Sequence, residues 1–102
     1  MARIDEIRKL LGNDPNDVFL NYSLAMELHA ADQSADALAQ IERTIELDGN
    51  YLAAYVKKAE WLIAEGRADD AASTLRTAAR IAEEIGDHHM LENVRESLAM
   101  LE

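Results

Sequence analysis

The sequence predicts an all-α protein built by stacking helix–turn–helix repeats, and two observations lead to this prediction. The chain of 102 residues is rich in Ala, Leu and Glu and has only four glycines and one proline, a balance that favours helix over sheet. Residues 18–51 are also restated by residues 52–85 at an offset of 34, so that Ala37, for example, corresponds to Ala71. A fixed offset of this length indicates helical units that bury their apolar faces against one another.

The first helix is expected over residues 2–11, where the apolar residues have helical spacing and Gly12 is placed to end the helix. The turn cluster at 13–17 contains Pro15, which stops this helix, and Asn and Asp side chains that can cap the next one. A second helix follows over 18–31. Its apolar residues form two stripes, so the helix must be covered on two sides.

Ser34 is the expected N-cap of a third helix over 35–47, which the turn at 48–50 ends. A fourth helix is expected over 51–65, with Gly66 just beyond its end. Connections of about three residues between helices favour antiparallel neighbours.

A fifth helix is expected over 68–85, and Asp87 is the expected N-cap of a sixth. The sixth helix has an apolar side and a charged side, which is what a terminal capping helix requires.

The pattern resembles the tetratricopeptide repeat (TPR) family. The 34-residue motif of that family places small residues where helix backbones approach closely and large residues beside them. The small positions are filled here by Ala25, Ala37, Ala59, Ala71 and Ala78, and the large positions by Leu24, Leu28, Ile41, Tyr55, Leu62 and Leu75.

The resemblance implies a right-handed α-solenoid that forms a single domain over residues 1–102. Within it, 1–15 is the second half of a truncated repeat, 18–51 is the first full repeat, 52–85 is the second, and 87–102 is the capping helix.

Three residues depart from the family pattern. Asp32 stands where glycine is usual and Gly49 where proline is usual, and both substitutions lie within ordinary turn chemistry. Lys58 occupies a core leucine position of the second repeat. Its aliphatic stem could pass the edge of a short array, or the residue could loosen that helix pair.

The resemblance also implies a concave groove, lined by the first helix of each repeat, in which partner peptides or helices lie. Lys57 is the one basic residue near this groove. The residues of this sequence that correspond to the groove are Phe19, Tyr22, Met26, His29, Ala53, Val56, Lys57, Glu60 and Ile63. An apolar groove with a methionine and two aromatic residues suits a hydrophobic peptide or the apolar face of an amphipathic helix.

Two alternatives compete with a foreign partner in this groove. The terminal helices could fold over it, or a second copy of the chain could cover it, which would make the protein a homo-oligomeric structural subunit, for instance a homodimer. Some TPR proteins instead clamp a C-terminal carboxylate with Lys and Asn. Tyr22 and Met26 stand at the first two of those positions, so the clamp is not supported.

The net charge of −10, from 20 acidic and 10 basic residues, argues against a nucleic-acid partner and leaves a basic partner as a minor option beside simple solubility. No stretch approaches the roughly 18 uninterrupted apolar residues that a membrane span needs, and no signal-like apolar segment follows Met1. The expectation is therefore a soluble cytoplasmic protein that has no membrane partner.

Residues for catalysis or for a cofactor are sparse. His88 and Glu92 have the spacing of one helical turn and could share a metal ion, but at an exposed helix start they are expected to be solvated. There is no cysteine, phosphate-binding glycine loop, nucleophile elbow or acid/base pair. The sequence therefore predicts a protein-binding adaptor rather than an enzyme, with no metal and no cofactor.

Overall fold

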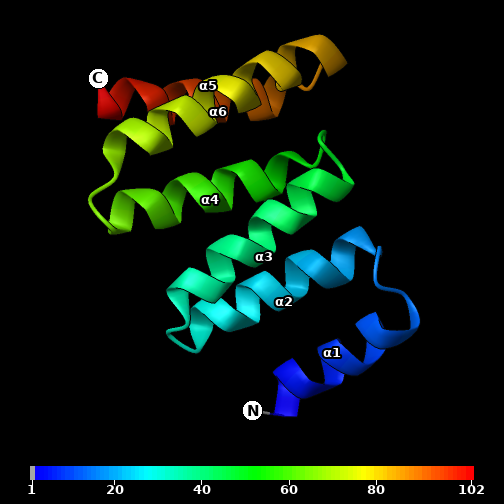
Figure 1. The fold of residues 1–102 in the computed structure, drawn as a ribbon. Helices are drawn as coiled ribbons and strands as arrows, with labels where there is room; N and C mark the ends of the chain where they lie inside the picture. Colours follow the sequence, from blue (N-terminus) through cyan, green and yellow to red (C-terminus); the bar gives the residue numbers. More distant parts are fainter. Residues whose placement is uncertain (1) are drawn as a thin grey trace. The chain divides into compact units, whose positions relative to one another are not determined.

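The computed structural model describes residues 2–102, and the regular structure within this range consists of α-helices (Figure 1). The helices are α1 (Ala2–Asn13), α2 (Val18–Ala30), α3 (Ser34–Leu47), α4 (Leu52–Ala64), α5 (Ala68–Ile85) and α6 (His88–Leu101). The prediction of an all-α fold is confirmed. None of the helices in this range is long and apolar enough to cross a membrane.

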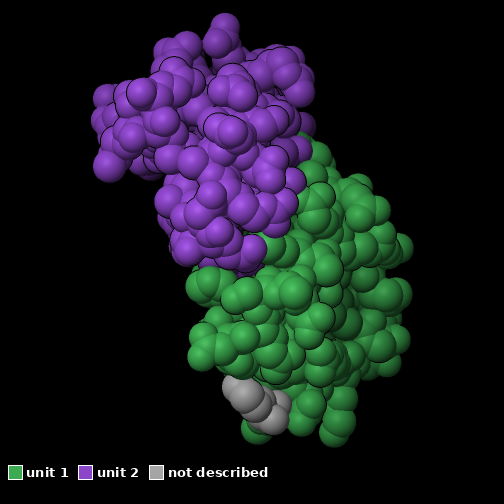
Figure 2. Space-filling view, turned by 60° about the vertical axis from the view of Figure 1, so that its left-hand side comes forward, with its two compact units in different colours: residues 1–49 green, residues 50–102 purple. Residues whose placement is uncertain are grey.

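The chain forms two compact units, one ending at Gly49 and the other beginning at Asn50 (Figure 2). In the first unit, α2 packs against both α1 and α3, and neighbouring helices run antiparallel. In the second unit, α5 packs in the same way against α4 and α6. The predicted domain and repeat boundaries themselves stay a prediction.

The helices α2 and α4 end in the same backbone motif, 34 residues apart. After α2, Asp32 takes a left-handed conformation with φ 61°, and the N–H of Gln33 donates to the carbonyl of Leu28 at 2.9 Å. After α4, Gly66 has φ 76°, and the N–H of Arg67 donates to the carbonyl of Leu62 at 2.8 Å. These are Schellman motifs, which satisfy carbonyls at the helix end. Aspartate is one of the few residues with a side chain that tolerates this conformation.

The predicted caps of α2 and α6 are confirmed. Asp17 accepts a hydrogen bond from the N–H of Leu20 at 2.8 Å, and Asp87 accepts one from Met90 at 3.0 Å. Each carboxylate satisfies a backbone donor that the first turn of a helix leaves free.

The prediction that Ser34 caps α3 is wrong, because Ser34 is the first residue of the helix and Gln33 precedes it as N-cap. The Schellman motif at Asp32 completes the turn one residue earlier than predicted, so that α3 begins at Ser34 and not at Ala35. The carbonyl of Gln33 then accepts the first helical hydrogen bond, from Ala37 at 2.9 Å.

The prediction that Gly12 ends the first helix is also wrong, because α1 continues to Asn13. The N–H of Asp14 donates to the carbonyl of Leu10 at 3.1 Å, so the helical bonding passes through Gly12. The helix stops before Pro15, which has no N–H to donate and disfavours a helical conformation in the preceding residue.

Small buried residues lie where helices pack closely within each unit. Ala25 and Ala37 in the first unit and Ala71 and Ala78 in the second have no exposed surface. The absence of a larger side chain lets the helix backbones approach, and larger residues fill the space beside them. The larger core residues are Ile4, Ile7, Leu24, Leu28 and Ile41 in the first unit, and Leu52, Tyr55, Trp61, Leu62, Leu75, Ile81, Leu91 and Val94 in the second.

Candidate partner-binding surface

Apolar residues surround almost the whole circumference of α2, because Glu27 and His29 are the only acidic and basic residues among its 13. One side of this helix is buried in the packing with α1 and α3, through Asn21, Leu24, Ala25 and Leu28. The buried side accounts for only part of the apolar surface. The remainder forms a second stripe that does not belong to the core of this unit.

The second stripe of α2 carries the four residues that were predicted to bind a partner. Phe19 has 66% of its surface exposed, and Tyr22, Met26 and His29 are half-buried. Their spacing of three and four residues places them along one side of the helix. The exposed Phe19 stands in a row with the half-buried Tyr22 and Met26 and is not a single scattered apolar residue, so this stripe is the strongest candidate surface.

The five predicted residues of α4 are also accessible. Ala53, Val56 and Lys57 are half-buried, Glu60 is exposed, and Ile63 has 42% of its surface exposed. The ammonium of Lys57 lies 3.1 Å from the carboxylate of Glu60 one turn away. This pair leaves the α4 stripe nearly neutral and more polar than the stripe on α2.

The nine predicted residues therefore form two sets, one on α2 in the first unit and one on α4 in the second. Each set shares one side of its helix. That both sets line one groove stays a prediction. Lys58, at the core leucine position, is half-buried on α4, as expected when a lysine stem packs and the ammonium remains near water.

The charged side of α6 gives little support to metal or acid/base chemistry. His88 and Glu92 are exposed and border a shallow hollow on the helix surface together with Leu91, Arg95, Glu96 and Ala99. Across residues 2–102, there is no group of three His, Cys, Asp or Glu side chains placed to hold a metal ion.

The sequence did not reveal the role of Asn21, a polar residue that is 3% exposed in the core of the first unit. It corresponds at the 34-residue offset to Tyr55, which is also buried. A polar residue in place of a large apolar one was the available signal. What it could not show was the partner, Gln40, which lies 19 residues further along the chain.

Comparisons with known proteins agree with this architecture. No protein-family model matches the sequence, and no curated protein matches it. The solution structure of a tetratricopeptide repeat domain protein from Salinibacter ruber is 30% identical and superposes with a TM-score of 0.81. That match covers 86% of this chain and 89% of the other.

Two more distant structures share the fold. The TPR2B domain of yeast Sti1, solved as a complex with pHsp70, has 21% identity and a TM-score of 0.85 over 96% of this chain and 78% of the other. The type III secretion chaperone SycD of Yersinia enterocolitica, solved with a peptide of the translocator YopD, has 20% identity and a TM-score of 0.72. Here the match covers 92% of this chain and 78% of the other.

The offset of 34 residues, the paired antiparallel helices and the match to the Salinibacter protein together define the class. The chain belongs to the tetratricopeptide repeat family.

Proposed function

We propose that this protein is a binding module whose ligand is a peptide or an amphipathic helix of another protein. The ligand lies on the stripe formed by Phe19, Tyr22, Met26 and His29 on α2. The observation that carries the proposal is the 66% exposure of Phe19 on a helix whose opposite side is fully packed.

The chemistry of the stripe suits such a ligand. Aromatic residues supply large contact area, and methionine adapts its flexible side chain to irregular apolar surfaces. Peptide complexes of Sti1 and SycD, which share this fold, support a binding role over a catalytic one.

The test is capture of partners from the native lysate by the protein and by two variants. Phe19→Ser should lose the retained partner, because it removes the most exposed anchor of the stripe. Leu10→Ser is the matched control, since Leu10 is a 54% exposed apolar residue of α1 that lies outside the stripe. Equal retention of the partner by all three proteins would overturn the proposal.

Light scattering over a range of concentrations separates a foreign partner from self-association. A monomer at high concentration is expected. A dimer that dissociates when Met26→Glu places a charge on the stripe would instead make a second copy of the chain the primary occupant.

A further inference from the structure

The two units differ in how an acid at corresponding turns is paired, and in the first unit this turn directly follows α2. In the second unit, the carboxylate of Asp70 is 2.9 Å from the guanidinium of Arg67, and the preceding turn residue is Gly66. At the same offset the first unit has Asp36, Gln33 and Asp32. The acid is retained there, a neutral residue replaces the cation, and an acid replaces the glycine. The second unit has its own further acids, Glu65 and Asp69, so the net charge is −2 at both 31–36 and 65–70, and the units differ in whether these acids have a cation beside them.

The two acids of the first unit are both exposed. Within the described residues neither Asp32 nor Asp36 has an ion-pair partner. Asp32 directly follows the C-cap of α2, and its N–H donates to the carbonyl of His29, the last residue of the stripe, at 3.1 Å. Asp32 therefore lies at the C-terminal end of the stripe, and Asp36 lies in the first turn of α3, which begins two residues further on.

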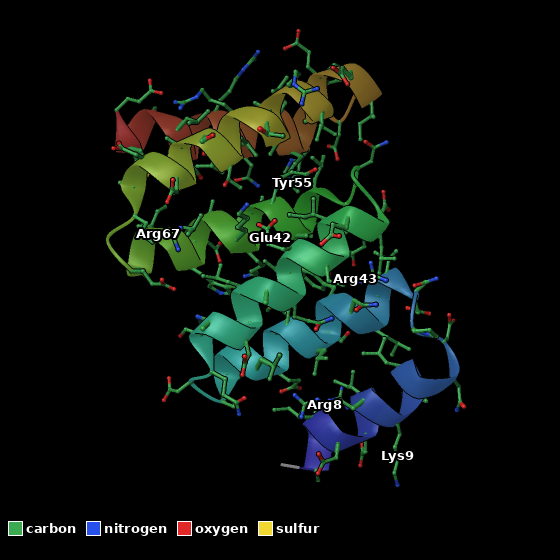
Figure 3. All side chains as sticks on the ribbon, viewed as in Figure 1. Arg8, Lys9, Glu42, Arg43, Tyr55 and Arg67 are labelled. Carbon is green, nitrogen blue, oxygen red and sulfur yellow. The ribbon has the colours of Figure 1, made fainter. Side chains whose placement is uncertain are left out.

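None of the four basic residues of this unit, Arg3, Arg8, Lys9 and Arg43, forms an ion pair with Asp32 or Asp36 within the described residues. Up to Gly49 the chain has ten acidic residues and four basic ones, and α2 contains no lysine or arginine. Arg3 lies 3.2 Å from Glu27, and Arg43 donates to Asn16 at the opposite end of α2 (Figure 3). Lys9 projects from the side of α1 that faces away from α2 (Figure 3).

We infer that the ligand of this stripe is a cationic amphipathic helix, with its apolar side against Phe19, Tyr22 and Met26 and its lysines or arginines against Asp32 and Asp36. This inference rests on the proposed function and adds the charge and orientation of the partner. Opposite charges at the rim of an apolar interface raise the association rate and set the orientation. The helix α2 is about 20 Å long, which matches a partner helix of about four turns.

The test uses three synthetic peptides of about 18 residues, a length that spans α2. The first places leucines on one side and lysines at one end, the second replaces the lysines with glutamates, and the third scrambles the first. Binding is measured by fluorescence anisotropy at low and high salt. The lysine helix should bind at least about tenfold more tightly than the glutamate helix at low salt, with a smaller ratio at high salt.

Single substitutions then locate the charge. Asp32→Asn and Asp36→Asn should each weaken the lysine helix by about two- to fivefold, the range expected for one exposed charge pair. Asparagine also tolerates the left-handed conformation at position 32, so this variant keeps the turn. Asp69→Asn is the matched control, because it removes an exposed acid from the first turn of α5 and should leave binding unchanged.

The outcomes separate this inference from the proposed function. The lysine and glutamate helices could bind with equal affinity, and Phe19→Ser could weaken both to the same extent. In that case the inference of a cationic partner is wrong, and the proposed binding function of the stripe is retained. If Phe19→Ser changes the affinity of none of the peptides, or none binds, both proposals fall. Tight binding of the scrambled peptide would show attraction by charge alone and would overturn the inference.

Discussion

The side-chain amide of Gln40 on α3 donates a hydrogen bond of 2.5 Å to the side-chain oxygen of Asn21 on α2. The amide nitrogen of Asn21 in turn donates to the carbonyls of Pro15 at 3.1 Å and Asp17 at 2.8 Å. One buried side chain thus joins two helices to the loop that leads from α1. All the polar atoms of the Asn21 side chain are satisfied, as burial in an apolar core requires.

Asn21→Ala should lower the free energy of unfolding by about 1–3 kcal/mol, because the buried groups that it bonds lose their partner. Urea denaturation followed by circular dichroism measures the change. Ser23→Ala, a half-buried position on the same helix, is the control and should shift stability by at most about 0.5 kcal/mol. Equal stability of the two variants would mean that the network contributes nothing.

Asp87→Ala should destabilise the protein by about 0.5–2 kcal/mol, since it removes the cap that the carboxylate makes with the N–H of Met90. Asp87→Asn should retain most of that stability because asparagine caps equally well. Ser34→Ala should be nearly neutral, because Ser34 is not the N-cap of α3. Thermal melts compare the three variants, and a large loss for Ser34→Ala would contradict the observed helix start.

Gly86→Ala should cost about 1–2 kcal/mol, because Gly86 has φ 77° and a side chain there strains the backbone. An added Cβ would meet no described atom within 4 Å, so the loss comes from conformation and not from a clash. Gly49→Ala is the control, since Gly49 lies outside the positive-φ region and also has open space. It should be neutral or slightly stabilising in the same denaturation experiment.

Ala71→Leu should destabilise the second unit by about 1–3 kcal/mol, because Ala71 has no exposed surface and a larger side chain overpacks its helix contact. Ala68→Leu, at an exposed position in the first turn of the same helix, should have little effect. If the two variants unfold at the same urea concentration, Ala71 is not a close-packing position.

Local signals in the sequence were sufficient for most helix ends. Gly66 and Asp87 act as predicted, and within the predicted capping cluster at 13–17 it is Asp17 that caps α2. Each needs only its own turn: a left-handed residue, or a carboxylate three residues before a free N–H. The prediction for Gly12 was wrong because glycine can lie inside a helix as well as end one. The hydrogen bond from the N–H of Asp14 to the carbonyl of Leu10 shows that the helix continues past Gly12. The prediction for Ser34 was wrong because the turn at Asp32 ends one residue earlier than the polar residues 32–34 indicate, so that Gln33 is the N-cap of α3.

The candidate site was predictable to the level of a helix side and no further. Helical period separated the stripe with Phe19 and Met26 from the buried side of α2, and all nine predicted residues are accessible. The charge contrast between Asp36 and Asp70 needed the structure, because the sequence retains the acid in both copies. Only the position of the Arg67 guanidinium shows that one of these acids is neutralised.

The two terminal helices each bury two residues, Ile4 and Ile7 in α1 and Leu91 and Val94 in α6, and so differ from α5. The helix α1 buries Ile4 and Ile7 alone, whereas α5 buries Ala71, Ala72, Thr74, Leu75, Ala78, Ile81 and Ala82. Local opening has the lowest free energy where the fewest apolar contacts are lost. The amides of α1 and α6 should therefore exchange with solvent early while those of α5 remain protected, so that α2 can lose its cover on the α1 side while α5 stays folded.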